Sequence, residues 1–253
     1  MKGKEKTPII QLMKLIKRAL KDSNQIIFMD FEGTQLTQEI IAIGAVKVTL
    51  DNKNFIKKVH NPFKIYILAE GVVGPIVTSL TGITDIFLFE HGETFINALQ
   101  KFKKYCGENL ARTSFMTYGT FDMRLLHQTS LMNKCEDDEL IQEIYRKNID
   151  FSNILSKYCR SSRNEMLSLN DALRKFNITP RGDAHDPQFD AINLSFLYNA
   201  FLKEKNILKD EYYKVLTQNP KLPVPVSKLL HKLLVEGTIT EKDFMNFIEE
   251  DLR

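Results

Sequence analysis

Two acidic residues, two positions apart at the end of an apolar run, constrain the fold of this chain most strongly. The run covers residues 25–29 (QIIFM), and Asp30 and Glu32 come at its end. Apolar runs of this length are typical of buried strands, and the two-residue period of a strand places both carboxylates on one face. Like charges on one face of a buried strand are destabilising unless a cation balances them. The pair therefore indicates either an exposed strand end or a cation site.

Two further acids fall where helices are expected to begin. Asp122 follows a second apolar strand and a glycine, within residues 116–122 (MTYGTFD). Asp190 lies about one turn into a helix that Asp186 caps and Pro187 begins, because Asp is favoured at the cap and Pro at the first helical position. Asp122 alone is explained by the helix dipole, which favours negative charge at a helix N-terminus. A lone helical Asp such as Asp190 usually only faces water.

His185 immediately precedes that helix, on a loop to which Gly182 gives freedom. A lone loop histidine is usually only solvated, but with the four acids it completes the residue set of a two-metal phosphodiester hydrolase. In such enzymes two divalent ions, about 4 Å apart, hold the attacking and leaving oxygens, and carboxylate oxygens suit Mg²⁺ or Mn²⁺. A neutral imidazole near pH 7 can take the proton from the attacking water.

The apolar periodicity predicts an α/β fold. Strands at residues 25–29, 39–50 and 55–60 are expected to form an antiparallel meander, and residues 114–118 a fourth strand. The predicted order begins with strands and continues with strands that alternate with helices. This order indicates a mixed sheet with helices on both faces. Helices are expected at residues 9–20, 93–106, 122–130, 151–159, 168–176 and 186–203.

The segment after about Lys205 differs in character from the rest of the chain. Pro220, Pro223 and Pro225 mark a linker, and two short amphipathic helices are expected after it. We therefore expect an N-terminal amphipathic helix within residues 1–24, a catalytic domain in residues 25–204 and a helical extension in residues 205–253. The extension could be a homodimer contact, a surface for a protein partner or a cover for the core.

Composition argues against several classes of protein. No run of about 18 apolar residues occurs, so no membrane span is expected. The three cysteines form no CxxC pair, which argues against a disulfide framework and a cysteine zinc site and favours a reducing, cytoplasmic location. A net charge of +3 is compatible with a polyanionic substrate without requiring one.

Four motifs resemble, in the right order, those of the DnaQ-like exonuclease superfamily in its histidine-bearing DEDD branch, the type of RNase T and of DNA polymerase III proofreading subunits. They are residues 29–34 (MDFEGT), 80–84 (LTGIT), 118–122 (YGTFD) and 185–191 (HDPQFDA). The sequence departs from the family pattern at three positions. Gln35 stands where many members have glycine, Thr81 where histidine is common, and Pro187 where alanine is usual.

The resemblance implies an RNase H-like fold, with a mixed five-stranded sheet flanked by helices. It implies a 3'-5' exonuclease that binds two divalent cations, Mg²⁺ or Mn²⁺, and releases nucleoside 5'-monophosphates from the 3' end of single-stranded RNA or DNA. Asp30, Glu32, Asp122 and Asp190 would be the metal ligands, and His185 the general base. Gly33 and Thr34 would line the pocket for the terminal nucleotide.

Phe31 and Phe121 lie beside the acids in the sequence. Bases stack on aromatic side chains in single-strand sites, which makes Phe31 a candidate substrate contact, whereas Phe121 is expected to pack in the core.

Two other functions are compatible with part of the pattern. Asp30-x-Glu32-x-Thr34 also resembles the Asp-x-Asp-x-Thr loop of haloacid-dehalogenase-like phosphatases, in which Asp30 would be the nucleophile. Against this, the second acid is Glu, and no acidic pair follows a later strand. A non-catalytic nucleic-acid-binding module on the same fold is the other alternative, although all five candidate catalytic residues are present.

Overall fold

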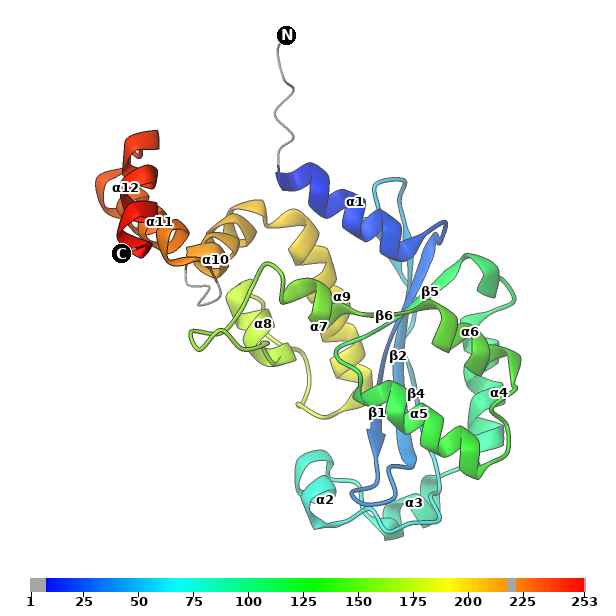
Figure 1. The fold of residues 1–253 in the computed structure, drawn as a ribbon. Coiled ribbons are helices and arrows are strands. Elements are labelled where there is room, and N and C mark those ends of the chain that lie inside the picture. Colours follow the sequence, from blue (N-terminus) through cyan, green and yellow to red (C-terminus); the bar gives the residue numbers. More distant parts are fainter. Residues whose placement is uncertain (1–7, 218–221, 253) are drawn as a thin grey trace.

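The computed structural model describes residues 8–217 and 222–252, and its centre is a mixed sheet with helices on both faces (Figure 1). The strand order is β3-β2-β1-β5-β6, and β4 pairs with β2 beside β3. β2 runs antiparallel to β1, whereas β5 runs parallel to β1 and β6 parallel to β5. The strands are β1 (Gln25–Gly33), β2 (Ile40–Leu50), β3 (Ile56–Val59), β4 (Phe63–Tyr66), β5 (Thr113–Thr117) and β6 (Asn148–Asp150).

The predicted mixed sheet and its antiparallel meander are confirmed, but the described chain has six strands where five were expected. The sequence pattern missed β4 and β6, which are only four and three residues long. β2 is long enough to pair with both β3 and β4 on the side away from β1.

The helices include most of those predicted. The expected helix over 151–159 ends early, and α2, α3, α6 and α10 were not anticipated. The two helices expected after the linker are present as α11 and α12, whereas Pro220 lies outside the described residues. The helices are α1 (Pro8–Leu20), α2 (Pro75–Thr81), α3 (Asp85–His91), α4 (Phe95–Cys106), α5 (Phe121–Met132), α6 (Glu139–Lys147), α7 (Phe151–Leu155), α8 (Leu169–Lys175), α9 (Pro187–Lys203), α10 (Lys205–Thr217), α11 (Val224–Glu236) and α12 (Glu241–Asp251), with a 3₁₀ turn at Leu110–Arg112.

Side chains of β1 alternate between two cores on opposite faces of the sheet. Ile26 and Phe28 pack into the core shared with α1 and α9. Ile27, Met29 and Phe31 pack into the other core, with residues of α4, α5 and α6. Because side chains two apart in a strand share a face, Asp30 and Glu32 continue the α9 face, as the sequence predicted.

The long helix α9 is fixed across this face. Its buried side of Ala191, Leu194, Leu197 and Tyr198 faces β1 and β2, as predicted. Near its start the helix approaches Gly44 of β2 so closely that a Cβ there would lie 2.0 Å from the carbonyl carbon of Pro187. Only glycine permits this approach, which sets the height of the first turn of α9 over the sheet.

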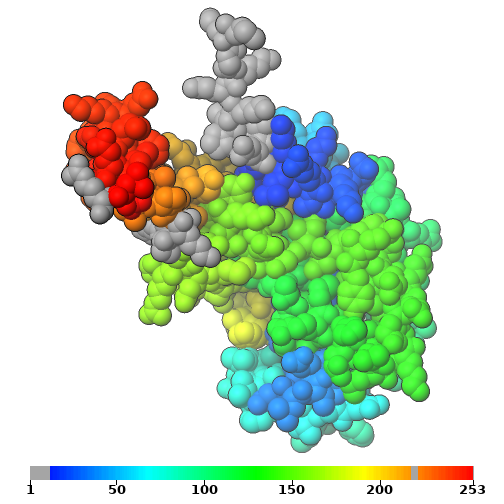
Figure 2. All heavy atoms as spheres, in the orientation of Figure 1, coloured from blue at the N-terminus to red at the C-terminus, as the bar shows by residue number. Residues whose placement is uncertain are grey.

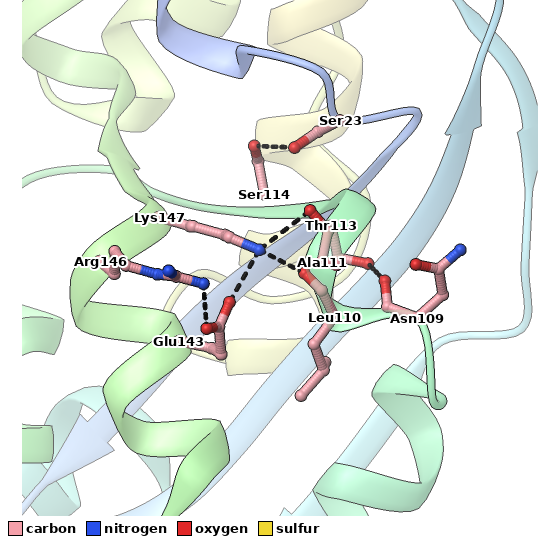
Figure 3. Close-up of polar contacts among 9 residues, drawn as sticks. All are labelled: Ser23, Asn109, Leu110, Ala111, Thr113, Ser114, Glu143, Arg146 and Lys147. Atoms are coloured by element: carbon pink, nitrogen blue, oxygen red, sulfur yellow. Dashed lines mark hydrogen bonds and ion pairs between the residues drawn. The ribbon is translucent and has the colours of Figure 1, made fainter.

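A cluster of polar contacts around Lys147 joins α6 to the segment before β5 (Figure 3). Lys147, at the end of α6, donates to the backbone carbonyls of Leu110 and Ala111 at 2.6 and 3.1 Å. Its ammonium also lies 2.7 Å from a carboxylate oxygen of Glu143. Because these carbonyls precede β5, the cluster fastens α6 to the strand that leads toward Asp122.

The two ends of the chain differ in how they join the core. Leu12, Ile16 and Leu20 of α1 and Leu208 of α10 belong to the same buried cluster as α9. In contrast, α11 and α12 pack mainly on each other and form a lobe that stands off the body (Figure 2, red and orange). No helix in the described ranges is both long enough and apolar enough to cross a membrane.

Candidate active site

The four acids predicted from the sequence come together at one edge of the sheet. Asp30 and Glu32 lie in the second half of β1, while Asp122 and Asp190 lie in the first turns of α5 and α9. The carboxyl ends of the parallel strands β1 and β5 meet at this edge, and α5 begins just after β5. Asp30 is close enough to the other three to be influenced by the charge of each.

Asp122 is held by the backbone of the neighbouring strand. Its carboxylate accepts a hydrogen bond from the Phe31 backbone N–H at 2.8 Å, and the residue is almost fully buried. The turn before it passes through Gly119, whose φ of 109° favours glycine. Asp150, at the end of β6, accepts a hydrogen bond from the Gly119 N–H at 3.0 Å. This second contact, which the sequence did not indicate, fixes the turn that delivers Asp122.

Burial raises the pKa of all four acids, and the charge of at least one neighbouring carboxylate adds to each shift. Burial, followed by the charges of Asp122 and Glu32, raises the pKa of Asp30 well above its usual range. Burial and the charge of Asp190 raise the pKa of Glu32 to about 8, and burial raises that of Asp122 to about 7. Burial also raises the pKa of Asp190.

No lysine or arginine of the described chain forms an ion pair with any of these four carboxylates; the nearest nitrogen group that an ion-pair distance records is the His185 ring, 3.9 Å from Glu32. The cluster therefore lacks a counter-charge of its own. Hard divalent cations prefer carboxylate oxygens, so the donor set and its unbalanced charge fit divalent metal.

His185 stands at the rim of the cluster. Its backbone adopts φ 64°, and its N–H donates to a carboxylate oxygen of Asp190 at 3.0 Å. Its side chain is 49% exposed, with Nδ1 3.9 Å from Glu32 Oε1. One ligand atom from each of Glu32, His185 and Asp190 lies within 4.8 Å of the others. The imidazole is therefore next to the acids but open to solvent, as a loop position before α9 predicted.

Contacts on both sides of His185 anchor its loop. Asp186 caps α9 by accepting from the Gln188 N–H at 3.0 Å, as predicted, and its other oxygen accepts from Lys64 at 2.6 Å. On the other side, the buried Asn193 pairs with both the N–H and the carbonyl of Arg181, at 2.9 and 3.0 Å. Lys64 lies 122 positions before Asp186, so no local sequence signal could have identified it.

The loop after Glu32 is closed by a chain of hydrogen bonds. The Glu39 N–H donates to the Thr34 hydroxyl at 2.9 Å, and the Thr37 hydroxyl donates to the Glu39 carboxylate at 2.6 Å. The Thr34 and Thr37 hydroxyls are 2.6 Å apart, and because Thr37 gives its hydrogen to Glu39, Thr34 donates to Thr37. Glu39 also accepts from the backbone N–H groups of Glu70 and Gly71, each at 2.8 Å.

These bonds join the loop to the segment that leads into α2. Gly33 packs so closely on α5 that a Cβ would lie 2.4 Å from Leu125. The expected pocket-lining role of Gly33 and Thr34 stays a prediction, but the Thr34 hydroxyl is already engaged within its own loop.

Phe31 and Phe121 are exposed in the reverse of the way that the sequence suggested. Phe31 is only 4% exposed and packs in the core on the opposite face of β1 from Asp30 and Glu32. Phe121, expected in the core, is 45% exposed at the start of α5, with the Arg124 guanidinium 5.1 Å from its ring centroid. Phe121 rather than Phe31 therefore offers an exposed aromatic surface, one position before Asp122 in the sequence.

Comparison with known families and structures agrees with this arrangement. The family model RNase T, described as exonuclease, matches residues 27–196, a range that contains all five predicted catalytic residues. Among curated proteins no relative matches the chain.

Several solved structures share the fold at low sequence identity. The nuclease domain of 3'hExo, a DEDDh family member bound to rAMP, matches with a TM-score of 0.60 and 19% identity over 73% of this chain and 94% of that one. Cell-death related nuclease 4 (CRN-4) matches with a TM-score of 0.60 and 15% identity over 72% and 65% of the two chains. E. coli Exonuclease I, in complex with a dT13 oligonucleotide, matches with a TM-score of 0.58 and 14% identity over 77% and 44%. The RNase H-like fold expected from the sequence is confirmed.

The raised pKa values predict how the metal-free protein responds to pH. Glu32 and Asp122, with folded pKa values of about 8 and 7, bind protons more tightly folded than unfolded. Their contribution to stability is therefore greatest below about pH 4 and is lost as pH rises through 7 and 8. In EDTA, the unfolding temperature should fall between pH 5 and pH 8, and Mn²⁺ should reverse this fall by binding the folded state.

The matched variant Glu32→Gln keeps the shape of the side chain and removes its charge. In EDTA it should unfold at a higher temperature than wild type at pH 8 and at nearly the same temperature at pH 5, as measured by scanning calorimetry. A wild-type protein equally stable at both pH values, with Glu32→Gln no better at pH 8, would contradict the repulsion described above.

Proposed function

This chain belongs to the RNase T family of exonucleases, and from that premise we propose that it removes nucleotides one at a time from the 3' end of single-stranded nucleic acid. The observation that carries the proposal is the convergence of Asp30, Glu32, Asp122 and Asp190 in a half-buried cluster without a lysine or arginine partner among the described residues. We assign the exonuclease domain to residues 25–204.

Asp30, Glu32, Asp122 and Asp190 would hold two divalent cations, Mg²⁺ or Mn²⁺. When bound, such ions polarise the scissile phosphate and lower the pKa of the attacking water. The protein supplies the placement of the carboxylates: a strand fixes two of them, and the first turns of two helices fix the others. Because these acids are at least half-buried, their repulsion is only partly screened by solvent and favours cation binding over the metal-free state.

His185 would act as the general base. Its backbone is tied to Asp190, while its half-exposed ring lies beside Glu32 and can turn toward a water at the cluster. The neighbouring contacts of Asp186 and Asn193 limit how far the loop can move. Acid–base catalysis of this kind contributes roughly 10²- to 10⁴-fold to the rate.

A single-stranded end fits the surroundings of the cluster. The site lies at the edge of the sheet between the lobe of α2 and α3 and the body that carries α5 (Figure 1). The exposed Phe121 ring offers a stacking surface next to Asp122, and bases in single strands stack on aromatic side chains. The closed loop that contains Gly33 and Thr34 would form the wall against the terminal nucleotide.

Degradation of labelled single strands tests the proposal directly. RNA and DNA of the same sequence, each labelled at the 5' end, should both be followed in Mg²⁺, Mn²⁺ or EDTA. We expect a ladder that shortens from the 3' end only when metal is present, and the faster substrate identifies the preferred sugar. Absence of cleavage by folded protein with either metal would contradict the proposal.

Substitutions within the cluster separate metal binding from proton transfer. Asp122→Asn should abolish cleavage and weaken Mn²⁺ binding, because it removes charge from the ligand set. His185→Ala should lower kcat by about 10²- to 10⁴-fold and leave the Mn²⁺ affinity unchanged. Calorimetric titration with Mn²⁺, beside single-turnover cleavage, measures both effects. A loss of Mn²⁺ affinity in His185→Ala would show that His185 is a ligand rather than a base.

A further inference from the structure

A second cleft lies at the opposite end of α9 from the acidic cluster. It has a volume of about 780 Å³ and is bounded by α1, the turn between β2 and β3, and α10. None of the proposed catalytic residues lines it. Leu202, in its wall, is twelve positions along α9 from Asp190, or about 18 Å at the helical rise. Figure 1 shows α1 and α10 at one end of the molecule and α2 and α3 at the other.

The cleft is built mainly by segments that this chain adds to its family domain. Both α1 and α10 lie outside residues 27–196, the range that matches the family model. The two helices nevertheless join the main core through residues such as Ile16 and Leu208. The helices that form the walls of the cleft are therefore packed into the main core. The cleft is nevertheless separate from the catalytic site expected of the family.

Its floor and walls are largely apolar. They include side chains from α1, the β2–β3 turn, the segment after α7, and α10, among them Leu12, Met13, Phe55, Tyr158, Leu208 and Tyr212. Ligand pockets of about 300–1,000 Å³ with mostly apolar walls and a few polar groups are typical of small-molecule sites. Volume and lining therefore both suit the apolar body of a small ligand.

The cleft is surrounded by uncompensated positive charge. Lys17, Lys53, Lys205 and Lys209 line it from three sides, and no acidic residue does. Within the described chain, none of these lysines forms an ion pair. Lys205 and Lys209 are one turn apart on α10, so they present their charges on the same side of the helix.

Two acids close to the cleft, Glu211 and Asp51, are occupied elsewhere. Glu211 of α10 is paired with Lys175 and Lys214, at 2.7 and 2.6 Å. One carboxylate oxygen of Asp51, before the β2–β3 turn, accepts from two backbone N–H groups at 2.8 and 2.9 Å.

We propose that this cleft binds a small amphiphilic anion, with an apolar chain against the floor and an anionic head group among the lysines. A long-chain carboxylate such as dodecanoate has this chemistry and serves as the probe. Calorimetric titration below the micelle concentration should give binding at one site on the full chain. Acetate, which has the head group alone, should not bind, and dodecyltrimethylammonium, which has the same chain with the opposite charge, should bind at least tenfold more weakly.

Charge reversal at the rim tests the location. In Lys53→Glu/Lys209→Glu, which changes two exposed side chains, dodecanoate affinity should fall by about tenfold or more, because two attractive charges become repulsive. The matched control Lys57→Glu/Lys58→Glu, on the exposed strand β3, changes the net charge equally and should leave the affinity within twofold. Circular dichroism melting of both variants confirms that each is folded.

Three results would overturn the proposal. Equal binding of dodecanoate and dodecyltrimethylammonium would show that the lysines do not select an anion. Unchanged affinity in the rim variant would place the ligand elsewhere. Binding of a designed Leu- and Glu-rich amphipathic helix, without binding of dodecanoate, would make the cleft a groove for a protein partner. Because none of these measurements uses nuclease activity, they stand apart from the test of the proposed exonuclease.

Discussion

Repulsion among four carboxylates, one buried and three half-buried, is the constraint around which this structure is organised. Burial raises the pKa of Asp30, Glu32, Asp122 and Asp190, and the charge of at least one neighbouring carboxylate adds to each shift. A chain that only had to fold would gain from separating or neutralising them. The fold nevertheless holds these repelling carboxylates together, which indicates that cations bind there. The match to the exonuclease family model is in keeping with such a metal site.

The surrounding structure keeps these groups from relaxing apart. Because Gly44 has no side chain, α9 can pack closely on β2. The paired hydrogen bonds of Asn193 hold the loop before that helix. The Phe31 N–H fixes Asp122, although the Phe31 side chain points into the opposite core. The Glu39 carboxylate closes the neighbouring loop. The contacts of Gly44 with Pro187, of Phe31 with Asp122 and of Glu39 with Glu70 join elements that are distant in sequence, so the placement of the acids depends on the whole sheet rather than on any one motif.

Local patterns in the sequence predicted the parts of the site that local geometry determines. The two-residue period of β1 placed Asp30 and Glu32 on one face, and the cap at Asp186 fixed the phase of α9. Patterns could not predict strands as short as β4 and β6, whose pairing comes from β2 and β5. They also misplaced Phe31 and Phe121, because exposure at a strand end or helix start depends on what packs there from elsewhere. The Lys64–Asp186 contact is likewise tertiary.

Locating bound Mn²⁺ by anomalous diffraction tests the central claim most directly. Crystals of the full chain grown with Mn²⁺ should show anomalous peaks among the carboxylates of Asp30, Glu32, Asp122 and Asp190, and crystals of Asp122→Asn should show weaker or missing peaks. The carboxylate cluster would then be the metal centre on which the proposed nuclease chemistry depends. Well-ordered crystals without any peak among these four residues, or with Mn²⁺ bound only elsewhere, would contradict the account.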